Sequence, residues 1–186
     1  MNIPTLPTKR LILDAFTPAD APAGERLVSD HEVARFTLNI PHPYPEGGFL
    51  VWMGSHAADF ALGKSVAFAV RLHDRTLVGC VGVRVERPHD RGELGYWIGR
   101  PFWGRGYATE AARACLAYAF PHFGLHKVVA CHDPGNPASG RILVKLGMTH
   151  EGTRRGHLRK GDVYLDTVDY GLLRGDFTLP PEPQPA

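Results

Sequence analysis

The segment from Glu93 to Glu110 constrains the fold more than any other part of the chain. It passes from an apolar stretch through a glycine-rich turn directly into a run of alanines with helical spacing. Glycine backbones can approach a ligand closely, and the first N–H groups of a helix are unpaired and carry the positive end of the helix dipole. The turn around Gly104 and Gly106 therefore indicates an anion site, such as one for phosphate, although the same glycines could simply make a tight turn.

Two known phosphate-binding patterns fit this sequence poorly. The dinucleotide-binding pattern needs a last glycine where the chain has Thr109, and the strands before it look antiparallel instead of parallel. The stretch from Gly135 to Ile142 has the spacing of a P-loop, but Arg141 replaces the lysine and Ile142 replaces the magnesium-binding Ser or Thr. These departures argue against ATP hydrolysis and leave a nicotinamide-binding oxidoreductase as a weaker alternative.

The other hydrophobic patterns predict an α/β (α+β) fold, in which helices flank a mixed, mostly antiparallel twisted sheet. Runs rich in β-branched residues predict strands, while helical periodicity and capping residues predict helices. The predicted strands are 10–16, 66–72, 77–85, 91–99, 127–131 and two within 148–173, and the predicted helices begin after Thr17 and Asp30 and cover 46–61, 104–119 and 137–146. Because no repeat or linker interrupts this order, we expect one domain over residues 1–179, followed by a disordered proline-rich tail over 180–186.

The composition is that of an ordinary folded protein. The 186 residues are 44% hydrophobic and 22% charged, and 21 Lys+Arg against 19 Asp+Glu give a formal net charge of +2. No like-charged block favours a nucleic acid, and no apolar run approaches the roughly 20 residues that span a bilayer. The three cysteines and the histidines form no metal-ligand pattern. We therefore expect a cytoplasmic protein with no metal and with neither a nucleic-acid nor a membrane partner.

Two motifs together resemble the GNAT superfamily of N-acetyltransferases, and more closely its RimJ/RimL-type branch. They are Tyr-Trp-Ile-Gly-Arg-Pro-Phe-Trp-Gly-Arg-Gly-Tyr-Ala-Thr-Glu-Ala at 96–111 and the stretch from Asn136 to Met148. The resemblance extends from Pro7 to Phe177. It implies a single N-acetyltransferase domain that takes acetyl-CoA as cosubstrate in a cleft, formed where the strand ending at Ile98 and Gly99 diverges from the strand 127–131.

The resemblance also assigns cofactor-binding residues. The family motif for the pyrophosphate arm falls on residues 103–108, where tryptophan takes the Gln/Arg place, and the second motif begins at Asn136. The expected cofactor-binding residues are Ile98, Gly99, Trp103, Gly104, Arg105, Gly106, Tyr107, Ala108, Thr109, Asn136 and Ser139.

Acetyl transfer to an amine needs a base, a donor for the developing oxyanion and an acid for the departing thiolate. Glu93 is the expected base, acting directly or through water, and a backbone N–H near Ile98 or Gly99 is the expected oxyanion donor. Many family members place an acidic tyrosine where this chain has Leu143, so Ser139 is the expected replacement. A serine in the first turn of a helix can instead simply satisfy backbone amides.

The expected reaction is direct attack of a primary amine, because Cys131 lies in an apolar strand without an evident activating partner. The acceptor is either a protein N-terminus, such as that of a ribosomal protein, or a small amine. The missing tyrosine leaves a catalytically inactive acyl-CoA-binding sensor as the main alternative. The chain is expected to be a monomer or a homodimer.

Overall fold

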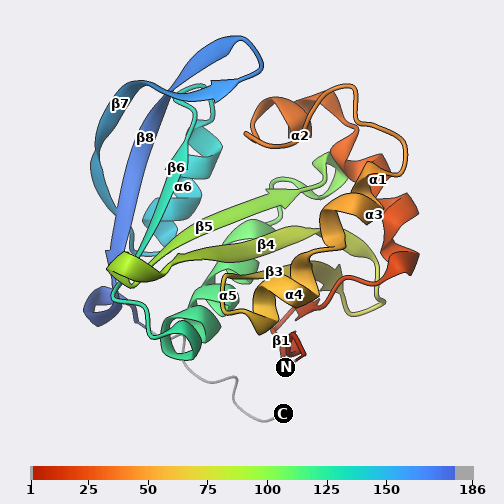
Figure 1. Cartoon of the computed structure of the whole chain (residues 1–186), viewed down its shortest axis with the longest axis horizontal. Coiled ribbons are helices and arrows are strands. Elements are labelled where there is room, and N and C mark those ends of the chain that lie inside the picture. The colour runs from red at the N-terminus through yellow and green to blue at the C-terminus, as the bar shows by residue number, and fades with distance from the viewer. Residues whose placement is uncertain (1, 179–186) are drawn as a thin grey trace.

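An eight-stranded sheet forms the framework of the structure, a computed structural model that describes residues 2–178 (Figure 1). The predicted tail at 180–186 lies outside the described residues, and the domain boundary at 179 stays a prediction. The strands are β1 Leu6–Pro7, β2 Leu11–Asp14, β3 Ser65–Leu72, β4 Leu77–Glu86, β5 Arg91–Ile98, β6 Lys127–His132, β7 Thr149–Lys160 and β8 Val163–Leu173. The helices are α1 Ala21–Val28, α2 His31–Arg35, α3 Gly48–Met53, α4 His56–Ala61, α5 Tyr107–Phe123 and α6 Pro137–Lys145.

The order of the strands is β1-β2-β3-β4-β5-β6-β8-β7, and every neighbouring pair is antiparallel except β5 and β6. The parallel pairing covers only Arg91 to Glu93 against Lys127 to Val129. Beyond Glu93 the two strands part, and β6 continues to His132 paired with β8 alone. Figure 1 shows the group β6, β8 and β7 turned away from β5. The expected mixed sheet and its diverging strand pair are confirmed.

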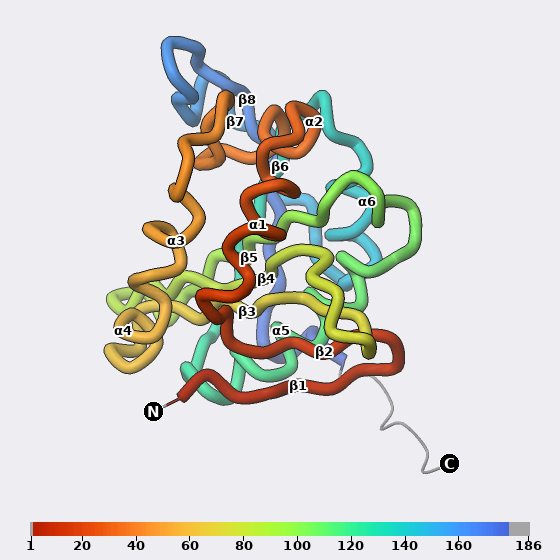
Figure 2. The backbone as a smooth tube through the Cα atoms, turned by 90° about the vertical axis from the view of Figure 1, so that its right-hand side faces the viewer, coloured from red at the N-terminus to blue at the C-terminus, as the bar shows by residue number. Residues whose placement is uncertain are grey.

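Helices cover both faces of this sheet. One core cluster joins α5 to the sheet through Ala111, Ala112, Cys115 and Ala119, all of which are buried. These small side chains allow the helix axis to approach the strands closely, as the alanine spacing predicts. The second cluster joins α1 and α3 to the opposite face around Phe49. Figure 2 shows α3 at one side of the molecule and α6 at the other.

The structure differs from the predicted elements in three places. The single helix expected over 46–61 is two helices, α3 and α4, which are separated at Gly54 and Ser55. Glycine is a weak helix former, so the chain bends there. The short strand β1 was not expected, and α5 begins at Tyr107 and continues to Phe123. Among the described residues no helix is both long and apolar enough to cross a membrane.

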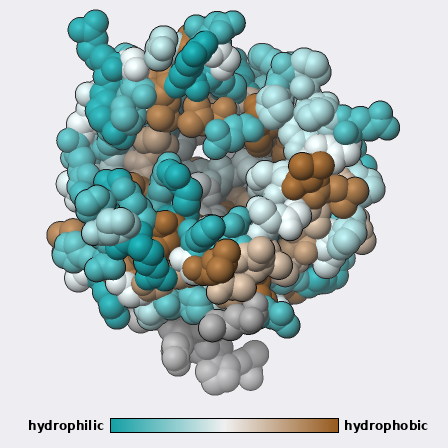
Figure 3. All heavy atoms as spheres, in the orientation of Figure 1, coloured by the Kyte–Doolittle hydropathy of each residue, from teal (hydrophilic) through white to brown (hydrophobic). Residues whose placement is uncertain are grey.

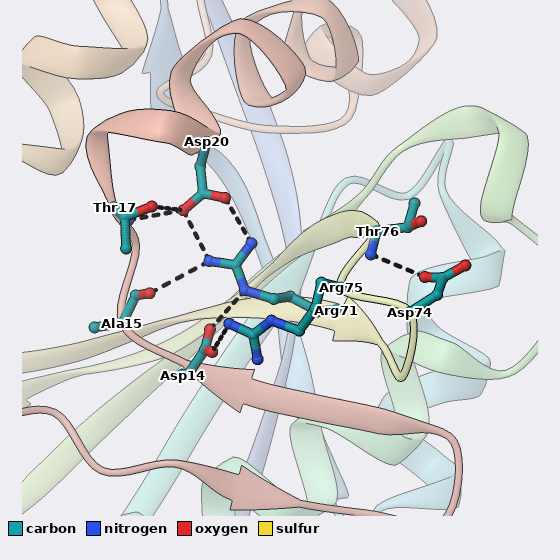
Figure 4. Close-up of polar contacts among 8 residues, drawn as sticks. All are labelled: Asp14, Ala15, Thr17, Asp20, Arg71, Asp74, Arg75 and Thr76. Atoms are coloured by element: carbon teal, nitrogen blue, oxygen red, sulfur yellow. Dashed lines mark hydrogen bonds and ion pairs between the residues drawn. The ribbon is translucent and has the colours of Figure 1, made fainter.

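A buried ion-pair network fixes the start of α1 to the sheet (Figure 4). Arg71 on β3 donates from Nε to Asp14 Oδ1 at 2.7 Å, and from Nη1 and Nη2 to the two carboxylate oxygens of Asp20 at 2.6 and 2.8 Å. Asp20 also accepts from the backbone N–H of Thr17 at 2.7 Å, and Arg75 donates to Asp14 Oδ2 at 2.6 Å. Bidentate charged contacts of this kind are strong and directional. The network therefore holds the start of α1 against β2 and β3.

Candidate functional site

A cleft of about 1480 Å³ opens where β5 and β6 part. Its walls come from β4, β5, the glycine turn, the end of β6, the first turns of α6 and the segment 36–49. Figure 3 shows this face of the molecule hollowed at its centre, with both hydrophilic and hydrophobic residues around the hollow. Ligand pockets commonly measure roughly 300–1000 Å³, so this cleft has room for more than one small molecule.

The glycine turn forms one end of the cleft. Gly104 and Gly106 have φ values of +73° and +78°, in the left-handed region that other residues rarely adopt. Inside α5 the first N–H to reach a carbonyl is that of Glu110, which donates to Gly106 O at 3.2 Å. The N–H groups of the three residues before it, at 107–109, therefore lack helical partners and carry the positive end of the helix dipole. The strand, turn and helix thus leave unpaired N–H groups at the place where the sequence predicts an anion site.

Two residues from the distant N-terminus brace this turn. Arg10 donates from Nε to Glu110 Oε2 at 2.7 Å and from Nη1 to the Arg105 carbonyl at 2.9 Å. Thr8 donates from Oγ1 to Glu110 Oε1 at 2.7 Å. Burial acts to raise the pKa of Glu110, but these hydrogen bonds and the Arg10 charge outweigh it and lower that pKa. Sequence reasoning missed this brace, because nothing local connects positions about a hundred residues apart.

The predicted cofactor residues of the turn share this wall with one exception. Trp103, Gly104, Gly106, Tyr107, Ala108 and Thr109 line the cleft, and the Arg105 side chain does not. Arg105 instead helps to hold the turn in place, because its backbone carbonyl accepts a hydrogen bond from Arg10.

The end of β5 corrects one expectation. The Gly99 N–H donates to the Val78 carbonyl at 2.8 Å, so it is not available to an oxyanion. Gly99 does not line the cleft, and a Cβ at this position would lie 2.6 Å from Leu27 Cδ2, so its role is close packing. Backbone groups alternate in direction along an antiparallel strand, and the Ile98 N–H therefore points to the side where β6 has left. The Ile98 carbonyl accepts from Trp103 Nε1 at 2.5 Å.

The first turn of α6 carries the predicted acid. Asn136 is the N-cap, and its side chain accepts from the Ser139 backbone N–H at 3.2 Å. The Ser139 side chain makes a different contact, because its Oγ lies 2.8 Å from the Oη of Tyr96 on β5. Both Asn136 and Ser139 line the cleft, and Leu143 is buried in the core. The sequence gives no local signal for this contact, because Tyr96 lies 43 positions before Ser139.

Glu93 lines the cleft at the point where β5 leaves β6. Its side chain is 46% exposed and forms an ion pair with Arg84, which is 78% exposed. Exposed pairs of this kind contribute about 0–1 kcal/mol, so the contact with Arg84 holds the carboxylate only weakly. Cys131 lies in the same wall, where burial and the charges of Glu93 and Asp169 raise the pKa of its thiol. A thiol that stays protonated is a poor nucleophile.

Another wall of the cleft is apolar, and hydrogen bonds from the β7–β8 hairpin, far along the chain, hold it in place. Tyr44, Trp52 and Phe36 contribute to it. Lys160, at the tip of the β7–β8 hairpin, donates from Nζ to the carbonyl of Thr37 at 2.7 Å and also to that of Ala34. Figure 1 shows this tip beside α2. Lys160 therefore ties the hairpin to the segment that forms this wall.

The chain matches the family described as "Acetyltransferase (GNAT) domain" over residues 10–149 and belongs to that family. "Uncharacterized N-acetyltransferase YoaA" of Bacillus subtilis is 28% identical over 173 residues, which cover 92% of this chain and 97% of YoaA. "[Ribosomal protein uS5]-alanine N-acetyltransferase" of Escherichia coli is 33% identical over 85 residues, which cover 46% of this chain and 44% of that protein. The solved structure of RimL, a ribosomal L7/L12 α-N-protein acetyltransferase in complex with coenzyme A, superposes with a TM-score of 0.82 at 16% identity and covers 91% of this chain and 98% of RimL.

These comparisons confirm the resemblance to GNAT acetyltransferases of the RimJ/RimL type and the expected fold. The protein is an acetyltransferase, and GNAT acetyltransferases use acetyl-CoA. Among residues 2–178, no group of three or more His, Cys, Asp or Glu side chains is arranged to hold a metal ion.

Proposed function

We propose that this protein transfers the acetyl group of acetyl-CoA to a primary amine by direct attack. One observation carries the proposal: the outward N–H groups of the glycine turn and the unpaired edge of β5 open into the same cleft. The turn suits a phosphate-bearing ligand, and the strand edge suits a ligand with amide groups.

The residues present fit acetyl-CoA. The N–H groups at 107–109 would hold the pyrophosphate, because helix N-termini bind such anions. Arg141 and Lys145 on α6 line the cleft and add positive charge. The backbone groups of Tyr96 that face the gap would pair with a pantetheine amide, as an added strand does. When bound, acetyl-CoA supplies the acetyl group as a thioester.

Three groups of this chain then serve the reaction. The Ile98 N–H donates to the negative charge that develops on the carbonyl oxygen. The Glu93 carboxylate takes a proton from the acceptor ammonium, directly or through water, because only the neutral amine is nucleophilic. The Ser139 hydroxyl donates toward the departing sulfur. The raised pKa of the Cys131 thiol supports direct attack over an acetylated cysteine.

The acceptor is a protein N-terminal amine, such as that of a ribosomal protein, or a small amine. The E. coli relative, whose name gives a ribosomal-protein alanine as its substrate, supports the first kind. The apolar wall around Trp52 gives either kind a surface to contact, and Trp52 is 38% exposed. Leu143 stands where many family members have a tyrosine, but the cleft still holds two hydroxyl groups, those of Ser139 and Tyr96, in contact with each other. These hydroxyls argue against a catalytically inactive sensor.

A thermal-shift titration with acetyl-CoA, coenzyme A and NAD tests the cosubstrate. We expect acetyl-CoA and coenzyme A to stabilise the protein, by about 2.7 kcal/mol at 100 times their Kd. NAD serves as the control, because it carries a pyrophosphate but lacks pantetheine. Stabilisation by NAD alone would contradict the proposal.

A further inference from the structure

We infer that Tyr96 is a positioning residue for acetyl transfer: its hydroxyl donates to Ser139 Oγ and so turns the Ser139 hydrogen toward the departing sulfur. This inference rests on the proposed function, since it needs a thiolate to leave in the cleft. It adds a residue to which the sequence motifs assigned no role.

The first support is the path of the Tyr96 side chain. Tyr96 lies on β5 beyond Glu93, where the pairing with β6 has ended. Its Oη nevertheless lies 2.8 Å from Oγ of Ser139, in the first turn of the helix that follows β6. The side chain thus crosses the gap between the two diverging strands. The pair of hydroxyls therefore lies where the two halves of the cleft meet.

The second support is the hydrogen-bond inventory of Ser139. Its backbone N–H is already satisfied by the carbonyl and side chain of Asn136, at 3.1 and 3.2 Å. A hydroxyl has one hydrogen to donate and can also accept. If Ser139 Oγ accepts the hydrogen of Tyr96, its own hydrogen must point elsewhere, and the cleft is the open side. Ser139 is thereby held as a donor.

The third support is the protonation state of Tyr96. Burial raises the pKa of Tyr96 to about 12, although the hydrogen bond with Ser139 acts in the opposite direction. The phenol therefore keeps its hydrogen at neutral pH, and of the two acceptors near it, Ser139 Oγ at 2.8 Å is nearer than the Ser139 carbonyl at 3.4 Å. No net proton leaves Tyr96 in this arrangement. Both hydroxyls strengthen their bonds as negative charge grows on sulfur, so the effect belongs to the transition state.

Titration of the thiol of bound coenzyme A tests the inference without turnover. Its thiolate is followed by ultraviolet absorbance in complexes with the wild type, Tyr96→Phe, Ser139→Ala and the double variant. A donor to sulfur stabilises the thiolate, so we expect Tyr96→Phe to reduce the acid dissociation constant of the bound thiol roughly 3- to 10-fold, the effect of one net hydrogen bond. We expect the double variant to match Ser139→Ala, because Tyr96 acts through Ser139.

Kinetics supply the second measurement. Tyr96→Phe should lower kcat by a similar factor and leave the KM values for acetyl-CoA and the acceptor unchanged. Tyr118→Phe is the matched control, since Tyr118 is another partly buried tyrosine that packs on the core but does not line the cleft. It should change neither the thiol titration nor kcat.

The outcomes separate the two proposals. If the wild type does not bind coenzyme A, the proposed function fails and this inference fails with it. If coenzyme A binds but Tyr96→Phe leaves the thiol titration unchanged, only the inference is overturned. A further loss from Tyr96→Phe in the Ser139→Ala background would also overturn it, because Tyr96 would then act independently of Ser139.

Discussion

Removing the buried guanidinium of Arg71 should be among the most destabilising single changes in this protein. The Arg71 side chain is 5% exposed, and its partners Asp14 and Asp20 are 13% and 10% exposed. Arg71→Met keeps most of the apolar stem but leaves both carboxylates without their main partner. Breaking a buried ion pair in this way costs about 3–5 kcal/mol. Asp14 keeps Arg75 and Asp20 keeps Thr17, so we expect the lower end, about 3 kcal/mol.

The loss should depend on pH in a defined direction. In the wild type, burial acts to raise the pKa of Asp20, but the hydrogen bonds from Arg71 and Thr17 and the Arg71 charge lower it overall. A lowered folded-state pKa contributes stability above the unfolded pKa, and this contribution is lost as the pH falls through the folded value. Without Arg71, the effect of burial dominates and the folded-state pKa of Asp20 rises. Protonation of Asp20 as the pH falls then stabilises the folded variant relative to its unfolded state. The difference in stability between wild type and variant should therefore shrink from pH 7 to pH 4.

Urea unfolding at both pH values measures this effect. Arg75→Met is the control within the same network, because Arg75 also bonds Asp14 but its side chain is 57% exposed. We expect that control to lose less than about 1 kcal/mol. The reasoning is refuted if Arg71→Met loses no more stability than Arg75→Met at pH 7, or if its deficit is the same at both pH values.

Three further changes test the cleft. Gly106→Val should weaken acetyl-CoA binding at least tenfold in calorimetry, because valine cannot adopt the φ of +78° that the turn requires. The control is Gly124→Val, where φ is +65° just beyond the other end of α5. This control should strain the fold without changing the affinity for acetyl-CoA. Glu93→Gln should lower kcat/KM at neutral pH and recover in part at high pH, where more of the amine is neutral; an unchanged pH profile would exclude Glu93 as the base. Lys160→Met should raise the KM for the acceptor several-fold and leave that for acetyl-CoA unchanged, since Lys160 holds only the apolar wall. A rise in both KM values would refute that assignment.

The sequence predicts features that are local along the chain. The strand, glycine turn and helix around Gly104 and Gly106 are contiguous, and glycine is the residue that readily adopts the positive φ values found there. The helix predicted over 137–146 is equally local, and α6 is found there at Pro137–Lys145. Each of these signals lies within a few positions of the element it defines.

Contacts between distant positions were beyond sequence reasoning. The contact of Tyr96 with Ser139 spans 43 positions and requires the divergence of β5 from β6. The alternation of side chains along a strand could not show which face of β5 meets the cleft, because at a divergence the strand opens on both faces and along its edge. The rule also could not show that the Gly99 N–H is used by Val78, because that depends on the register between β4 and β5.

Acetyl transfer from isotopically labelled acetyl-CoA, followed by mass spectrometry across a panel of small amines and peptides with free N-termini, tests the central claim most directly. Matched peptides with a blocked N-terminus and no lysine are the controls. We predict label on the amine of at least one acceptor, one coenzyme A released per acetyl group transferred, and a large loss of rate in Ser139→Ala with the affinity for acetyl-CoA nearly unchanged. Tight binding of acetyl-CoA without transfer to any member of the panel, or a Ser139→Ala variant that retains the full rate of the chemical step, would contradict the account.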